Sequence, residues 1–111
     1  MPFFIAIMAH PDGDGWNCHL AAHVAYLKDL VAAGRLRASG PLIGTPHRSG
    51  FLIFTVPDRA KVEALVAADP FAVAGLIENV TITEWDPLFG AFAAESSGHL
   101  PGLQAPLPLE V

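Results

Sequence analysis

Two segments of this 111-residue chain hold side chains that could transfer protons. One has His19 and His23 near the start of an apolar helical pattern, and the other is the triplet Asp69-Pro70-Phe71 at the end of a second pattern. The helix dipole and desolvation both oppose an aspartate on the buried stripe at a helix C-terminus. We therefore expect it to have a partner. A histidine on the flank of the other helix would provide one, and together they could move protons near neutral pH.

His23 lies beside Leu20 and Leu27 on a helical wheel, at the edge of the core-facing stripe. It should therefore be partly buried near the sheet, where a neutral imidazole could act as a general acid or base. The alternative is a core-edge histidine whose ring bonds a backbone carbonyl. The spacing alone leaves both interpretations open.

Asp69 follows the apolar stripe of Val62, Leu65 and Val66 by three residues, so it points inward if the helix reaches it. An inward carboxylate could orient an imidazole, as the aspartate of a catalytic triad does. It could also cap a following short helix that has Pro70 at its first position. Both roles can hold at once, with one carboxylate oxygen for each.

A metal site is a further possibility, because His19 and His23 are four residues apart on a helix and His10 precedes them at a strand end. Asp12 and Asp14 alternate with glycine, however, so nothing fixes them at coordination distance. We predict a solvated loop and no bound metal.

Other candidate residues have ordinary explanations beside functional ones. Cys18 lies in a first helical turn, where a thiolate is stabilised, but we interpret it as a small filler. Trp16, Tyr26 and Trp85 could line an apolar pocket for a ring-shaped ligand, or could be core and interface aromatics. No glycine-rich phosphate loop is present, so we expect no nicotinamide or flavin cofactor.

The hydrophobic pattern predicts elements in the order βαββαβ. We expect strands at residues 2–9, 37–43, 51–56 and 76–85, helices at 16–33 and after the N-cap Asp58, and a short helical turn at 71–74. Gly34 should end the first helix, and Gly40-Pro41 should mark an edge or a bulge.

Right-handed connections between these elements give a ferredoxin-like α+β sandwich, a four-stranded antiparallel sheet with two helices on one face. Because the first and third strands are apolar on both sides, the other face needs a cover. The simplest cover is a second copy of the sheet, which makes a homodimeric α+β barrel.

Composition restricts the functional classes. The chain is 52% hydrophobic and only 15% charged, which suggests that part of its surface is buried against another subunit. A net charge of −5 argues against nucleic acid as a partner. The single cysteine fits a reducing cytoplasm, and we expect neither a signal peptide nor a membrane span.

The composition changes after Trp85, where proline, glycine and serine become frequent. We therefore place the domain at residues 1–87 and a C-terminal arm at 88–111, extended or disordered from Ser96 onward. Its apolar residues Phe89, Phe92 and Leu100 predict an arm that packs on the partner subunit.

Four ordered segments resemble those of the YciI-like (YCII-related) proteins: HVAYLKDLVAAGRL at 23–36, SGP at 39–41, ADPF at 68–71 and AGL at 74–76. The resemblance covers roughly residues 3–85. It implies a ferredoxin-like dimeric α+β barrel with a His–Asp active site at His23 and Asp69. Some relatives are dehydrochlorinases or are compared with muconolactone isomerase. The family commonly has arginine where this chain has His19, which leaves a preference for anionic substrates open.

We predict a cofactor-free enzyme in which His23 is the general acid or base and Asp69 orients it. The reaction would be isomerisation or elimination on a small, ring-derived substrate held between the sheet and the first helix. Two alternatives are a non-catalytic ligand-binding or regulatory module and a cofactor-free monooxygenase of the same fold. Six further residues are expected to contact substrate: His10, His19, Tyr26, Gly40, Pro41 and Phe71.

Overall fold

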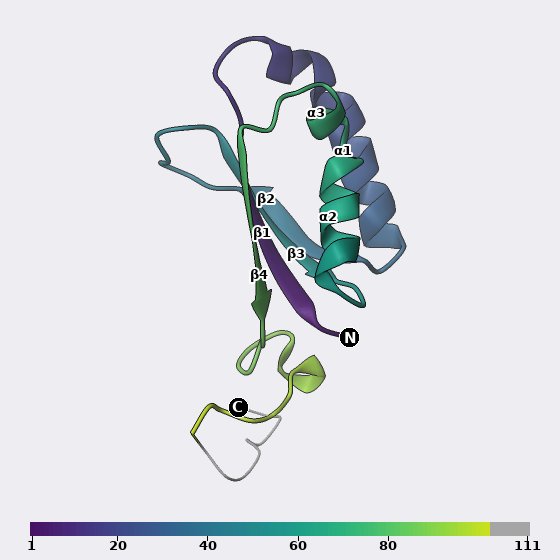
Figure 1. Ribbon diagram of the computed structural model, residues 1–111, viewed down its shortest axis with the longest axis vertical. Helices are drawn as coiled ribbons and strands as arrows, with labels where there is room; N and C mark the ends of the chain where they lie inside the picture. Colours follow the sequence, from purple (N-terminus) through teal and green to yellow (C-terminus); the bar gives the residue numbers. More distant parts are fainter. Residues whose placement is uncertain (103–111) are drawn as a thin grey trace.

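A single antiparallel sheet carries all the helices of the domain on one of its faces (Figure 1). The computed structural model describes residues 1–102. The strand order is β2-β3-β1-β4, which confirms the predicted ferredoxin-like sandwich. The elements are β1 (Phe3–Ala9), α1 (Gly15–Ala32), β2 (Leu36–Pro41), β3 (Ser49–Thr55), α2 (Arg59–Ala67), α3 (Pro70–Val73) and β4 (Asn79–Trp85).

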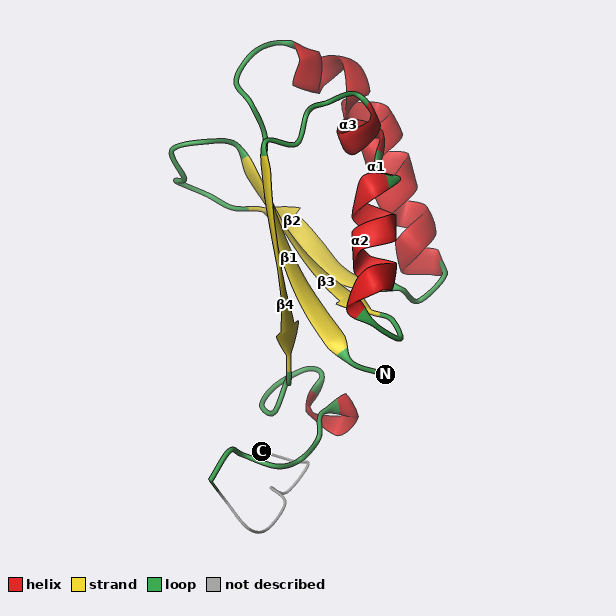
Figure 2. Cartoon of the chain, in the orientation of Figure 1, coloured by secondary structure: helices red, strands yellow, loops and turns green. Residues whose placement is uncertain are grey.

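Local signals in the sequence account for where the helices begin and end (Figure 2). The side chain of Asp58 accepts a hydrogen bond from the amide of Lys61, so it caps α2 as predicted. Gly34 has φ +75°, and this left-handed conformation lets the chain turn out of α1 into β2. β4 begins later than predicted, because Leu76 bonds back to the carbonyl of Phe71 and closes the turn after α3.

The core lies between the helices and the covered face of the sheet. The alternation of the strands places Phe4, Ala6 and Met8 of β1 on this face, each nearly fully buried. Leu52 and Phe54 of β3 lie on the same face, beside them in the sheet. Helix α2 closes the core with Val62, Leu65 and Val66.

β2 is an edge strand, as expected, but its irregularity lies at Arg37 and not at Gly40-Pro41. Leu36 pairs with Phe54 and Ala38 pairs with Ile53, so Arg37 is an extra residue between two consecutive partners. Such a bulge reverses the facing of every residue that follows it. Ser39 therefore pairs with Leu52 on the helix-covered face.

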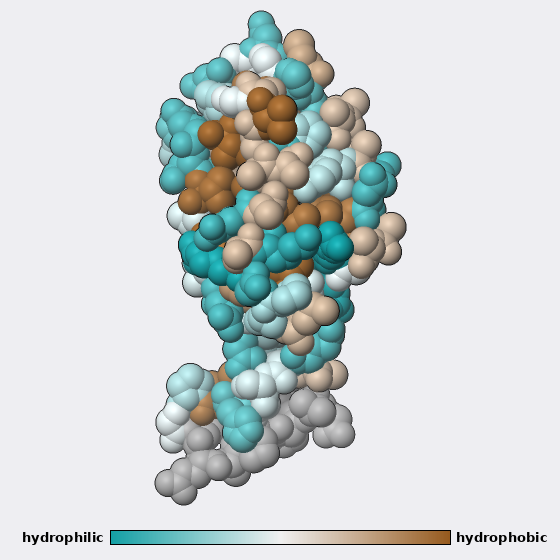
Figure 3. All heavy atoms as spheres, turned by 45° about the vertical axis from the view of Figure 1, so that its right-hand side comes forward, coloured by the Kyte–Doolittle hydropathy of each residue, from teal (hydrophilic) through white to brown (hydrophobic). Residues whose placement is uncertain are grey.

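Helices α1, α2 and α3 leave the other face of the sheet uncovered. Ile5, Ile7 and Phe51 are only partly buried there, and Ile7 is 37% exposed. Apolar side chains also interrupt the hydrophilic surface on the helical side of the molecule (Figure 3). Val24 and Val31 of α1 are likewise exposed, at 39% and 54%.

The segment after β4 folds back onto its own chain. It holds a short 3₁₀ helix, η1 (Ala93–Glu95), and the ring of Phe92 contacts those of Phe3 and Trp85 at centroid distances of 5.4 and 6.4 Å. Phe92 thus packs within the chain, whereas Phe89 is exposed, and contact of the arm with a partner stays a prediction. Residues 88–102 of the predicted arm are described, and residues 103–111 lie outside the described part.

Arg37 ties this segment to β2. Its guanidinium donates two hydrogen bonds of 2.7 Å to Glu95 and lies 5.0 Å from the ring centroid of Phe92. The same bonds lower the pKa of the Glu95 carboxyl and raise that of Arg37.

Among the described helices, none combines the length and hydrophobicity that a membrane crossing requires.

Candidate active site

The two segments singled out in the sequence meet between α1 and the end of α2. Nδ1 of His23 lies 2.9 Å from Oδ1 and 2.8 Å from Oδ2 of Asp69. Asp69 is 2% exposed, and the side chain of His23 is 13% exposed. Because a carboxylate can only accept, Nδ1 carries the proton, and Nε2 is left free on the opposite edge of the ring.

Asp69 performs both of the tasks considered from the sequence. Its Oδ1 accepts the amide hydrogen of Phe71 at 2.9 Å, which caps α3 in front of Pro70. Both carboxylate oxygens also lie within hydrogen-bond distance of His23. The start of α3 therefore holds the carboxylate at the position where it orients the imidazole.

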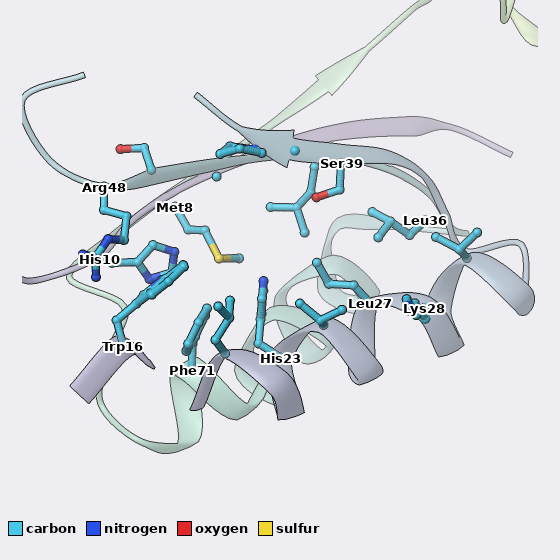
Figure 4. A pocket seen from close by; sticks show the side chains of 18 residues that line it. Met8, His10, Trp16, His23, Leu27, Lys28, Leu36, Ser39, Arg48 and Phe71 are labelled. Carbon is cyan, nitrogen blue, oxygen red and sulfur yellow. The ribbon is translucent and has the colours of Figure 1, made fainter. Parts of the chain in front are cut away.

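Phe71 fixes the plane of the His23 ring. The two rings stack at a centroid distance of 4.2 Å and an interplanar angle of 23°. Trp16 stacks on Phe71 at 5.7 Å, and Figure 4 shows Phe71 between Trp16 and His23. The imidazole is thus held by a hydrogen bond at one edge and by an aromatic ring on one face.

His23 opens onto a cavity of about 420 Å³ between α1 and strands β2 and β3 (Figure 4). This volume suits a small organic molecule. Most of the walls are apolar, with polar groups at a few points. The lining residues are Met8, His10, Trp16, Leu20, His23, Val24, Leu27, Lys28, Val31, Leu36, Ser39, Gly40, Pro41, Arg48, Ser49, Gly50, Leu52 and Phe71.

Four of the six predicted substrate contacts line this cavity: His10, Gly40, Pro41 and Phe71. His19 does not, because a four-residue step along a helix leaves an offset of about 40°, which turns it into solvent. Tyr26 does not either. It faces α2, where its hydroxyl donates to the carbonyl of Leu65 at 2.7 Å. Burial raises the pKa of the Tyr26 phenol, and the nearby Asp69 carboxylate raises it further.

Four polar residues of the cavity lining were not predicted as site residues: Lys28, Ser39, Arg48 and Ser49. Arg48 and Ser49 reach the site through the register of β3 against β1, which pairs Ser49 with Ala9 and brings Arg48 beside His10. The amide of His10 donates to the carbonyl of Arg48 at 2.8 Å. The guanidinium of Arg48 lies 4.3 Å from the ring centroid of Trp16, a cation–π contact at the edge of the site.

Residues 1–102 form no metal centre, and Cys18 lies away from the cavity. No group of three or more potential ligand side chains is close enough there to hold an ion. Cys18 is exposed on α1 and is absent from the cavity lining. Trp85 contacts Phe3 and Phe92 on the other face of the sheet, so of the three aromatics considered only Trp16 lines the cavity.

The sequence profile of the YCII-related domain matches residues 1–86. The chain belongs to the YCII-related family. This assignment confirms the resemblance drawn from the four ordered segments. No curated protein sequence matches the chain at a significant level.

Solved structures extend the comparison to the fold. The chain is similar to the 5-chloro-2-hydroxyhydroquinone dehydrochlorinase TftG from Burkholderia phenoliruptrix AC1100, solved in complex with 2,5-dihydroxybenzoquinone. The TM-score is 0.66 with 27% identity, over 75% of this chain and 92% of that one. Rv0793 from Mycobacterium tuberculosis shares the fold, with a TM-score of 0.51 and 16% identity over 82% of this chain and 99% of that one.

Proposed function

We propose that this YCII-related protein catalyses cofactor-free proton transfer on a small planar organic molecule, as an isomerase or as a lyase that eliminates halide. One observation carries the proposal. The Nε2 of His23 opens onto an apolar cavity while its Nδ1 is held by the buried carboxylate of Asp69. This arrangement suits a general acid–base group.

In the proposed reaction, Nε2 of His23 removes a proton from a hydroxyl or C–H group of the bound ring. The electron pair of that bond enters the ring, and the carboxylate of Asp69 stabilises the imidazolium that forms. In an isomerisation, the imidazolium returns the proton to a different ring atom. In an elimination, the carbon–halogen bond breaks and the halide leaves with its electron pair, so HX is lost without an external oxidant.

The cavity walls support a ring-shaped substrate. Leu20, Val24 and Leu27 of α1 face Leu36 and Leu52 of the sheet across the cavity, so a flat apolar body would be enclosed between them. The dehydrochlorinase to which the chain is similar acts on a chlorinated hydroxyhydroquinone. An elimination on a hydroxylated, halogenated ring is accordingly the first reaction to test.

The test is a screen of chlorinated and unsubstituted hydroxylated rings under strict anaerobiosis, with ultraviolet absorbance and chloride release as readouts. We expect turnover by the wild type and a loss of about 10³-fold or more in the His23→Asn variant, in which the base is absent. His99→Asn, an exposed histidine in the C-terminal segment, is the matched control and should keep full activity.

Turnover without oxygen would exclude the monooxygenase alternative. Binding without turnover of any compound in the screen would contradict the catalytic proposal and favour a ligand-binding module. Equal activity in the wild type and the His23→Asn variant would show that His23 is not the base.

We also propose that two copies pair through the open face of the sheet. The support is the apolar group Ile5, Ile7 and Phe51, which no described element covers fully. Sedimentation should show a dimer that Ile7→Glu weakens by about tenfold or more, since a buried charge opposes association. Val73→Glu, at a position 77% exposed on the helical side, is the control and should leave the dimer intact.

A further inference from the structure

His10 is a second imidazole in the cavity, and the proposed proton transfer gives it no role. It follows β1 directly and is 4% exposed. Its Nδ1 lies 2.7 Å from the carbonyl oxygen of Leu76. Because a carbonyl can only accept, Nδ1 must donate, and the neutral ring therefore presents Nε2 as an acceptor without a proton.

The ring of His10 extends towards the cavity interior, beside Met8 and close to Trp16 (Figure 4). No side chain or backbone group within residues 1–102 hydrogen-bonds its Nε2. This atom is therefore an acceptor that is accessible from the cavity, and a molecule that covers it without supplying a donor loses free energy.

The two histidines present the same kind of group to the same space. The centroid of the Phe71 ring lies 4.2 Å from that of His23 and 4.9 Å from that of His10. Each Nδ1 is fixed as a donor to the protein, so each Nε2 is left as an acceptor. A single small ring in the cavity can therefore meet two acceptors at different points of its edge.

Two positively charged side chains around the cavity favour a hydroxylated ring as its ligand. Arg48 and Lys28 line it at the loop before β3 and on α1, and no described carboxylate forms an ion pair with either. Their positive charge would stabilise a ring oxygen after its proton has moved to an imidazole.

We propose that His10 is a specificity-determining residue that accepts a hydrogen bond from a second ring hydroxyl, so that the site selects planar rings with at least two hydroxyl groups. This inference rests on the proposed function, because it places the first hydroxyl at His23. Rings with one hydroxyl leave one of the two acceptors unpaired and bind more weakly.

Two substitutions separate the acceptor of His10 from its structural hydrogen bond. In His10→Asn, the amide nitrogen can replace Nδ1 as donor to Leu76 while the acceptor at Nε2 is lost. In His10→Gln, the amide oxygen can reach the Nε2 position, so the acceptor is kept and the bond to Leu76 is sacrificed. Thermal unfolding of each variant verifies that it is folded before binding is compared.

The experiment measures binding of phenol, catechol, resorcinol and hydroquinone by calorimetry, without oxygen and at about pH 8, above the usual imidazole range. We expect the best diol to bind the wild type about three- to tenfold more tightly than phenol, the value of one neutral hydrogen bond. His10→Asn should abolish this advantage and leave phenol binding unchanged. His10→Gln should restore most of it.

The outcomes distinguish the two proposals. If the diol advantage persists in His10→Asn, the inference about His10 is wrong while the proposed function stands. If no compound binds the wild type, the ring-substrate proposal itself fails. If His10→Gln and His10→Asn lose the advantage equally although both are folded, an acceptor at the Nε2 position is not sufficient for the preference, and the inference about His10 is wrong.

Discussion

Replacing Asp69 by asparagine and by alanine should have different consequences, because its oxygens perform two tasks. Asparagine keeps an acceptor for the Phe71 amide, and Asn and Asp are equivalent N-caps, so we expect a loss of less than about 1 kcal/mol in the free energy of unfolding. Alanine removes the cap and leaves the largely buried Nδ1–H of His23 without an acceptor. These two losses together amount to about 2–4 kcal/mol.

The asparagine variant should also change the tautomer of His23. An amide NH₂ facing Nδ1–H would put two donors together, so Nδ1 should become the acceptor and Nε2 should carry the proton into the cavity. Nε2 would then be unable to act as a base. A comparable aspartate-to-asparagine change in a serine protease triad lowers kcat about 10⁴-fold, and we expect a loss of at least about 10²-fold in any activity found.

Denaturant unfolding measures the stability difference, and long-range ¹H–¹⁵N correlation spectra identify the tautomer of the neutral ring. Asp58→Ala is the matched control, since Asp58 caps α2 without a histidine and its loss should cost only about 1 kcal/mol. Equal destabilisation by Asn and Ala at position 69, or an unchanged Nδ1–H tautomer in the asparagine variant, would refute the reasoning.

Three further predictions follow from contacts outside the cavity. Phe92→Ala should lower the free energy of unfolding by about 1–3 kcal/mol, because the rings of Phe3 and Trp85 lose their contact with the ring of Phe92. Phe89 is exposed, so Phe89→Ala should change the free energy of unfolding by less than about 0.5 kcal/mol, and denaturant titration compares the two variants. Hydrogen bonds from the side chain and amide of Ser97 lower the pKa of Asp86, so their contribution to docking of this segment should be fully present above the ordinary carboxyl pKa and should weaken as the pH falls below about 4. The fluorescence of Trp85 as a function of pH monitors this weakening, and in Ser97→Ala the fluorescence change should occur at a higher pH. Tyr26→Phe should cost about 0.5–1.5 kcal/mol in thermal unfolding and leave ligand affinity unchanged, since Tyr26 faces Leu65; a change in affinity would contradict its placement.

The meeting of His23 and Asp69 was accessible from the sequence because each lies on or next to an apolar stripe. A βαββαβ order with right-handed connections brings the helix that carries His23 beside the end of the helix before Asp69. The N-cap role of Asp69 was accessible for a different reason, since Pro70 follows it. Local spacing and topology were sufficient for this part of the site.

The position of the cavity, between the sheet and the first helix, was predicted, but its full lining was not. The periodicity of Leu20, Val24 and Val31 predicts only that α1 has an apolar side; these side chains line an open space, and Val31 is 54% exposed. An apolar stripe shows that a surface avoids water, but it does not show whether protein or a ligand covers that surface. The contribution of Arg48 depends on the register of β3 against β1, which composition and periodicity do not determine.

The extra residue in β2 separates two tasks of that strand. Leu36 and Ser39 both lie on the helix-covered face, because their partners Phe54 and Leu52 are two residues apart in β3. Arg37 fits between them only as an insertion, and its side chain reaches the opposite face, where it binds Glu95. Deleting Arg37 would therefore leave Leu36, Ala38 and Ser39 on their present partners and keep the cavity wall, while the C-terminal segment would lose this attachment to β2. For evolution, the attachment of that segment can be gained or lost by a single residue without any change in the cavity.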